Sequence, residues 1–167
     1  MNSASVDYII VGGGSAGCVL AARLSENTNY QVMLIEAGVE GRNPLIHIPA
    51  GYIKTMVDPS INWMFKSEAE SGTANRRIAI PRGKVLGGSS AINGMLYVRG
   101  QVDDYNGWAQ RGNPGWSYDD VLPYFKKAEH CQAMAAGDTD FDSAIRGVGG
   151  PLNVAPVRNR YEALDRV

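Results

Sequence analysis

The stretch DYIIVGGGSAGCVLAARLS, residues 7–25, decides the fold. Its β-branched and aromatic run, Asp7 to Val11, predicts a short buried strand that the three following glycines bring to an end. Residues 15–25 repeat apolar side chains at helical spacing and predict a helix. A second apolar run, QVMLIE at residues 31–36, predicts another buried strand. The sequence therefore predicts an α/β fold that begins with a βαβ unit of two parallel strands, residues 1–38.

Gly12, Gly14 and Gly17 have the spacing GxGxxG at the junction between strand and helix. The first glycine suits a tight turn, the second lets a pyrophosphate approach the backbone, and the third lets the helix pack closely on the strand. Backbone N–H groups near Ser15 and Ala16 would then point at the anion from the positive end of the helix dipole. The alternative is a glycine-rich turn without a ligand, but the strand and helix around it favour a bound dinucleotide.

An acidic residue follows at the spacing that a dinucleotide site needs. Glu36 ends the second predicted strand about twenty residues beyond the last glycine, where its carboxylate can accept hydrogen bonds from ribose hydroxyls. A carboxylate at this place repels a 2′-phosphate, which disfavours NADP. These features alone do not distinguish FAD from NAD.

Beyond residue 38 the patterns predict shorter elements. Ser117 is the expected N-cap of a helix, because Asp120 follows three residues later as in a capping box. The predicted elements are an extended pair at 63–69 and 77–80, a helix that starts at the serines 89–90 and runs through 91–98, helices at 103–110 and 117–131, a surface loop at 133–150, and the beginning of a helix at 160–167.

A second glycine cluster lies in PRGKVLGGSSAINGMLYVRG, residues 81–100. Two adjacent glycines let the backbone lie flat against a large planar ligand, and serines that open a helix leave N–H donors for it. The alternative is a helix N-terminus packed on the βαβ unit. Here the chain resembles the glucose-methanol-choline oxidoreductase family, most closely its bacterial choline and alcohol dehydrogenase branch. The residues and segments that carry the resemblance are Gly83, Lys84, Gly87 to Ser90, Asn93, Tyr97, Gly100, Asn106, the opening DYIIVGGGSAGCVLAARLS, NPLIHIPAG, Asn62-Trp63 and GGPLNV at 149–154, so that it runs from Asp7 to the end.

The resemblance implies a Rossmann-like FAD-binding βαβ unit with an appended, mostly helical segment, incomplete relative to the family fold. It implies FAD as the cofactor, with residues 81–100 as a second flavin-contacting segment. Members that attach FAD covalently use a histidine at the position of Ile92, so the resemblance implies non-covalent FAD. The cofactor-binding residues expected from the glycine pattern and the resemblance together are Gly12, Gly14, Ser15, Ala16, Gly17, Glu36, Ala37, Trp63, Val85, Gly88, Ser89, Asn93, Gly94, Met95 and Leu96.

The reaction implied by the resemblance is hydride transfer from the CH–OH carbon of a small-molecule alcohol to flavin N5. A histidine near the C-terminus of the longer family members takes the hydroxyl proton. We therefore expect no catalytic residue and no substrate domain in this chain, which would supply FAD binding only and be inactive alone. The electron acceptor stays open between oxygen, a quinone and another carrier, and the likeness to dehydrogenases favours a carrier. The alternatives are a non-catalytic, truncated dinucleotide-binding fragment and an NAD-linked dehydrogenase domain.

Composition narrows the function further. A formal net charge of -1 and 44% hydrophobic residues suit a globular chain and disfavour nucleic acid as a partner. No export signal and no apolar run of the roughly 18 residues that span a bilayer is evident, so we expect no transmembrane segment and a cytoplasmic chain, with peripheral binding to the inner membrane left open. The two cysteines, Cys18 and Cys131, and the two histidines, His47 and His130, lie at no metal-ligand spacing, so we expect structural roles for them and no metal site.

Overall fold

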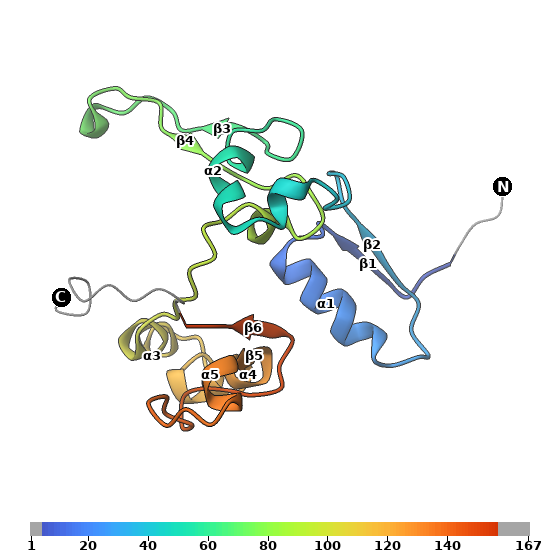
Figure 1. The fold of residues 1–167 in the computed structure, drawn as a ribbon, viewed down its shortest axis with the longest axis vertical. Coiled ribbons are helices and arrows are strands. Elements are labelled where there is room, and N and C mark those ends of the chain that lie inside the picture. The colour runs from blue at the N-terminus through green and yellow to red at the C-terminus, as the bar shows by residue number, and fades with distance from the viewer. Residues whose placement is uncertain (1–4, 157–167) are drawn as a thin grey trace. The chain divides into compact units, whose positions relative to one another are not determined.

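The structure, a computed structural model, describes residues 5–156 in two units (Figure 1). Unit 1 covers residues 5–96 and unit 2 covers residues 97–156. The helix predicted at 160–167 lies outside the described residues. Within residues 5–156, no helix has the length and apolarity that crossing a membrane requires.

Unit 1 begins with the predicted βαβ arrangement. Strand β1 (Tyr8–Val11) leads into helix α1 (Ser15–Ser25), and strand β2 (Val32–Ile35) returns beside β1 in parallel. The register pairs Ile9 with Met33 and Val11 with Ile35. Figure 1 shows α1 lying along this pair of strands. The helix has the predicted bounds, and the predicted strand order is confirmed.

The faces of these two strands are largely exposed. Ile10 is 8% exposed, whereas Ile9 is 60%, Val11 is 83% and Ile35 is 47% exposed. The prediction that both strands are buried is therefore wrong for this chain, because α1 covers only part of the pair and no third strand joins its sheet within residues 5–156. Parallel strands are normally covered on both faces, so β1 and β2 present apolar surface that other polypeptide could cover.

The rest of unit 1 consists of short elements around a small core. They are the 3₁₀ turns η1 (Pro44–Ile46), η2 (Pro49–Gly51), η3 (Ser71–Thr73) and η4 (Gly88–Ala91), helix α2 (Tyr52–Thr55), and strands β3 (Phe65–Lys66) and β4 (Ala79–Ile80). Strands β3 and β4 are antiparallel, which confirms the predicted extended pair in a shorter form. The core centres on Ile61, Val85 and Ile92, which are 1%, 0% and 3% exposed.

The helix predicted from the serines 89–90 through 91–98 is wrong beyond its first turn, since only η4 forms. Asn93 Oδ1 accepts a hydrogen bond from Met95 N–H at 2.9 Å, which folds the backbone into a local turn instead of a helix. Met95 then takes a left-handed conformation with φ of 58°, and a helix cannot pass through it. The apolar residues of this stretch follow an irregular path that the helical spacing did not reveal.

Helices are the main regular elements of unit 2, although much of its chain is irregular. It contains α3 (Val102–Gln110), α4 (Tyr118–Ala128), strand β5 (Glu129–Cys131), α5 (Gln132–Ala135) and strand β6 (Leu152–Val154), with β5 and β6 parallel. The predicted capping box of α4 is present, because Ser117 Oγ accepts from Asp120 N–H and Asp120 Oδ2 accepts from Ser117 N–H. The helix predicted at 117–131 ends at Ala128, since its last three residues pair with β6. The loop predicted at 133–150 is irregular except for the residues that α5 includes.

A charge cluster, made of Glu129, Arg99 and Arg146, organises unit 2. The Glu129 side chain is 0% exposed and accepts hydrogen bonds from both guanidinium groups, with Arg146 Nη1 at 2.9 Å from its Oε1. Gly147 N–H donates to Glu129 as well, at 3.3 Å. Burial acts to lower the pKa of Arg99, but its hydrogen bond to Tyr97 and the attraction of Tyr97 and Glu129 outweigh burial, so that the pKa is raised. The cluster joins the chain before α3 to the loop before β6.

Replacing Gly107 with alanine is expected to stabilise unit 2. Gly107 lies inside α3, and a Cβ added there meets nothing within 4 Å. Alanine in a helix interior is more stable than glycine by about 0.5–1 kcal/mol, because it loses less backbone entropy on folding. Hydrogen exchange of the α3 amides should therefore slow in Gly107→Ala.

The control for this prediction is Gly112→Ala, just beyond the end of α3. Gly112 has a φ of 95°, which alanine adopts only with strain, so the same substitution should accelerate exchange there. Equal effects of the two variants, or faster exchange in Gly107→Ala, would contradict the assignment of α3.

Candidate cofactor-binding site

Two glycine-rich segments of unit 1 meet: the first glycine segment (residues 12–17) and the second glycine segment (residues 83–96). Gly87 N–H donates to Gly13 O at 2.7 Å. A Cβ built on Gly88 would lie 2.8 Å from Gly14 Cα, so the two backbones touch at a point where no side chain fits. The segments that the sequence singles out separately thus form one continuous surface.

The N-terminus of α1 opens on this surface. Gly14 is its N-cap and provides no side-chain hydrogen bond, and Cys18 N–H donates to Gly14 O at 2.9 Å. The first backbone amides of a helix have no partner within the helix and attract an anion. A Cβ on Gly17 would lie 1.9 Å from Gly12 O, which fits the predicted role of the third glycine in close packing of helix and strand. The amides of Ser15, Ala16 and Gly17 can therefore bind a pyrophosphate.

Glu36 sits beside the first glycine segment with its carboxylate held by backbone. Its Oε2 accepts from Gly13 N–H at 2.6 Å, and its Oε1 accepts from Gly38 N–H at 2.8 Å. Each oxygen keeps a further lone pair for a ribose hydroxyl. Gly13 was not predicted as a site residue. A Cβ at this position would lie only 2.9 Å from Leu86 Cδ1, so the close packing here favours glycine. The uninterrupted run of three glycines was the signal for it.

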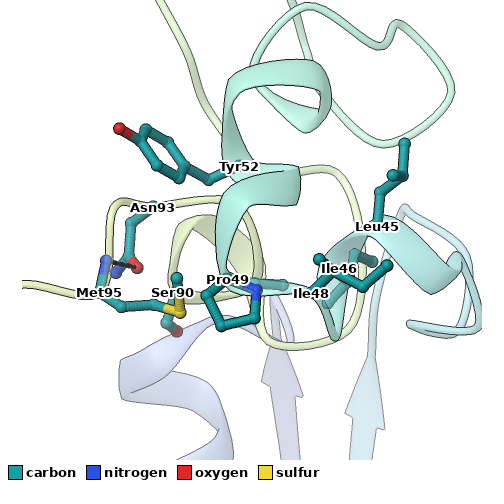
Figure 2. Close-up of a pocket in the computed structure, with 9 residues that line it drawn as sticks. Leu45, Ile46, Ile48, Pro49, Tyr52, Ser90, Asn93 and Met95 are labelled. Carbon is teal, nitrogen blue, oxygen red and sulfur yellow. Dashed lines mark hydrogen bonds between the residues drawn. The ribbon is translucent and has the colours of Figure 1, made fainter. Parts of the chain in front are cut away.

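The second glycine segment ends in exposed apolar residues. Met95 is 54% exposed and Leu96 is 88% exposed. Ala37, an expected cofactor contact that follows β2, is exposed as well. Figure 2 shows Asn93 and Met95 beside a small cavity that residues 45–52 close from the other side. Its volume of about 20 Å³ has room for one water molecule. Exposed apolar side chains next to glycine backbone suit a planar aromatic ligand lying on them.

The side chains of three expected cofactor contacts interact with other parts of the protein. The Val85 side chain is 0% exposed and packs in the core, so only the Val85 backbone can face a ligand, and its carbonyl already accepts from Gly88 N–H at 2.7 Å. Ser89 Oγ accepts from Gly83 N–H at 3.2 Å and shapes the segment. Trp63 stacks on Phe65 with a centroid distance of 5.8 Å and lies under Lys84 Nζ. A flavin contact by Trp63 stays a prediction.

The histidines and Cys18 make backbone hydrogen bonds, in line with structural roles. His47 Nε2 bonds to Gly41 O at 2.7 Å, and His130 Nδ1 accepts from Gly149 N–H at 2.9 Å. Cys18 Sγ donates to Gly13 O at 3.2 Å. Trp108 and Trp116 contact each other edge to face at 5.8 Å while staying about half exposed.

Comparison with known proteins identifies relatives of the whole chain. The family model described as GMC oxidoreductase matches residues 6–167. An oxygen-dependent choline dehydrogenase from Rhizobium etli (strain CIAT 652) is 49% identical over 148 residues, which are 89% of this chain and 26% of that protein. Pyridoxine 4-oxidase from Mesorbium loti matches in structure with a TM-score of 0.79 and 41% identity, over 89% of this chain and 28% of its own. A variant of formate oxidase from Aspergillus oryzae RIB40 matches with a TM-score of 0.82 and 28% identity, over 97% of this chain and 28% of its own.

These matches bear on the fold and on the extent of the chain. The solved relatives match the fold of this chain, which confirms the predicted fold class. The chain spans about a quarter of the length of the curated relatives it matches, 26% in the case above.

Proposed function

Because the chain belongs to the GMC oxidoreductase family, we propose that it provides the FAD-binding portion of a flavin-dependent oxidoreductase that acts on the CH–OH group of an alcohol. The observation that carries this proposal is the junction of the two glycine segments, where Gly87 N–H donates to Gly13 O and Gly88 touches Gly14. A dinucleotide with a large planar ring needs a phosphate site and a flat backbone surface next to each other. The junction supplies both on one surface of unit 1.

The residues of this chain bind and orient in the proposed function. The amides of Ser15, Ala16 and Gly17 hold the pyrophosphate, and Glu36 accepts from the ribose hydroxyls. Residues 93–96 would contact the ring system, and Met95 among them has a left-handed backbone with φ of 58°. When bound, FAD supplies the two-electron oxidation of the alcohol carbon. We assign no catalytic acid or base to the described residues.

The substrate and the electron acceptor are proposed from the relatives. Their printed names describe an oxygen-dependent choline dehydrogenase and a pyridoxine 4-oxidase, so we propose a small hydroxyl compound as substrate. The same names support oxygen as acceptor over the carrier that the sequence favours. A cytoplasmic location is also a proposal, which rests on the free thiols of Cys18 and Cys131.

We expect purified protein to bind FAD without a covalent bond. Ile92, at the position where some family members carry a flavin-linked histidine, has an unreactive side chain that is 3% exposed in the core. Denaturing the yellow protein and filtering it should therefore release all of the flavin, as measured by absorbance of filtrate and retained protein. Flavin retained with the denatured polypeptide would contradict the non-covalent assignment.

The same preparation tests the proposed function against its alternatives. Visible flavin absorbance, or saturable uptake of added FAD, supports the proposal. Colourless protein that rejects FAD and binds NAD supports the NAD-linked alternative and overturns the proposal. Bound FAD with no turnover of any alcohol by this chain alone is the outcome expected of a chain that supplies FAD binding only.

A further inference from the structure

Two serine hydroxyls bridge the glycine segments. Ser15 Oγ and Ser90 Oγ lie 2.8 Å apart, although 75 positions separate the two residues in the chain. Ser15 is the first residue of α1, and Ser90 lies in η4. The predicted cofactor contacts include Ser15 but not Ser90, whose side chain the proposed function does not use. The proposed function therefore gives no role to the contact between the two hydroxyls.

Proton counting fixes the direction of this hydrogen bond. Ser90 Oγ donates to Gly87 O at 2.6 Å, and a serine hydroxyl has only one proton to donate. Ser15 must then be the donor and Ser90 the acceptor in their shared bond. The resulting chain runs from Ser15 through Ser90 to the Gly87 carbonyl, while the Gly87 amide donates to Gly13 O. The amide of Gly87 is thus hydrogen-bonded to the first glycine segment directly, and its carbonyl is linked to that segment through Ser90 and Ser15.

We propose that Ser15 and Ser90 form a hydroxyl latch, in which Ser90 is a positioning residue that fixes the second glycine segment against the N-terminus of α1. The proposal rests on the proposed function, because it matters when one FAD contacts both segments. The Ser15 proton is engaged by Ser90 and is not offered to a phosphate. The backbone amides therefore hold the pyrophosphate, and the latch sets the spacing between those amides and residues 93–96.

Substitution of the latch should separate FAD from ADP. Ser90→Ala removes both hydrogen bonds and should weaken FAD binding about three- to tenfold, the range expected for the net loss of about one hydrogen bond. Ser15→Ala removes one of them and should have an equal or smaller effect, and the double variant should bind FAD no more weakly than Ser90→Ala. ADP, which ends at the pyrophosphate and does not reach residues 93–96, should bind Ser90→Ala as it binds the unaltered protein.

Two further variants serve as controls, measured by titration calorimetry with FAD and ADP. Ser90→Thr keeps the hydroxyl and should restore FAD affinity. Ser25→Ala removes a hydroxyl at the other end of α1, where Ser25 Oγ donates to Ala22 O, and should change neither affinity. Equal loss of ADP and FAD affinity in Ser90→Ala, additive losses in the double variant, or unchanged FAD affinity in Ser90→Ala would each overturn the latch.

Hydrogen exchange of the ligand-free protein separates this proposal from the proposed function. If the unaltered protein binds no FAD, the proposed function fails, and the latch is then judged by exchange at the Gly87 amide. Ser15→Ala and Ser90→Ala should both accelerate that exchange, whereas Ser25→Ala should leave it unchanged. Unchanged exchange in the two latch variants would overturn the latch whatever the protein binds.

Discussion

Glu129→Gln is expected to destabilise unit 2 by about 3–5 kcal/mol, the usual cost of removing one partner from a buried ion pair. The Glu129 side chain is 0% exposed, and its carboxylate neutralises Arg99 and Arg146. A neutral amide leaves both guanidinium groups without the buried carboxylate that neutralises them, although the side chains of Arg99 and Arg146 are themselves 12% and 28% exposed. Hydrogen exchange followed by mass spectrometry should show faster exchange in peptides from residues 97–156.

The matched control for this prediction is Glu68→Gln. Glu68 also pairs with an arginine, Arg77, at 2.9 Å, but these side chains are 82% and 57% exposed. Exposed ion pairs contribute little, so Glu68→Gln should change stability by less than about 0.5 kcal/mol. Equal effects of the two substitutions would mean that the charge cluster does not hold unit 2 together.

Gly88→Ala is expected to weaken FAD binding about tenfold or more, on the basis that a left-handed non-glycine residue costs roughly 1–2 kcal/mol before any clash is counted. Gly88 has a φ of 58°, and its added Cβ would lie 2.8 Å from Gly14 Cα. The backbone of Gly14 cannot retreat without moving the start of α1. The substitution therefore separates the two glycine segments at the point where they meet.

Gly72→Ala provides the comparison for Gly88→Ala. A Cβ at Gly72 meets nothing within 4 Å, so this variant should bind FAD as tightly as the unaltered protein. Hydrogen exchange of the β1 and β2 peptides shows whether Gly88→Ala leaves the βαβ arrangement folded. Unaltered FAD affinity in Gly88→Ala would show that the junction is not the binding surface.

Local patterns in the sequence predicted the parts of the fold that depend on neighbouring residues. Helix α1 has the predicted bounds, because apolar spacing and the glycines before it specify both its face and its start. The α4 N-cap at Ser117 follows from two residues three positions apart. The predicted close packing at Gly17 is local in the same way, since a Cβ added there would lie 1.9 Å from Gly12 O.

Apart from the local turn at Asn93 that ends the helix predicted at 91–98, the failures involve contacts that are distant in the chain. Residues 129–131 form a strand because β6 pairs with them, and the helical pattern of residues 117–128 gives no sign of that partner. Burial of the Val85 side chain with Ile61 and Ile92 is also hard to see in the local sequence, while the contact of Val85 with the cofactor stays a prediction. The bond between Ser15 and Ser90 is equally invisible in a single sequence, because nothing local to either serine specifies the other.

Both carboxylate oxygens of Glu36 are held by the amides of Gly13 and Gly38 before any ligand arrives. Immobilising a free glutamate side chain costs up to about 1.5–2 kcal/mol in rotamer entropy. Here that cost falls on folding, so under the proposed function a ribose would meet a carboxylate that needs no rearrangement. The adenosine end of a dinucleotide would thus bind to a site that is already in place. Only the ring at the other end would still have to adopt its bound orientation.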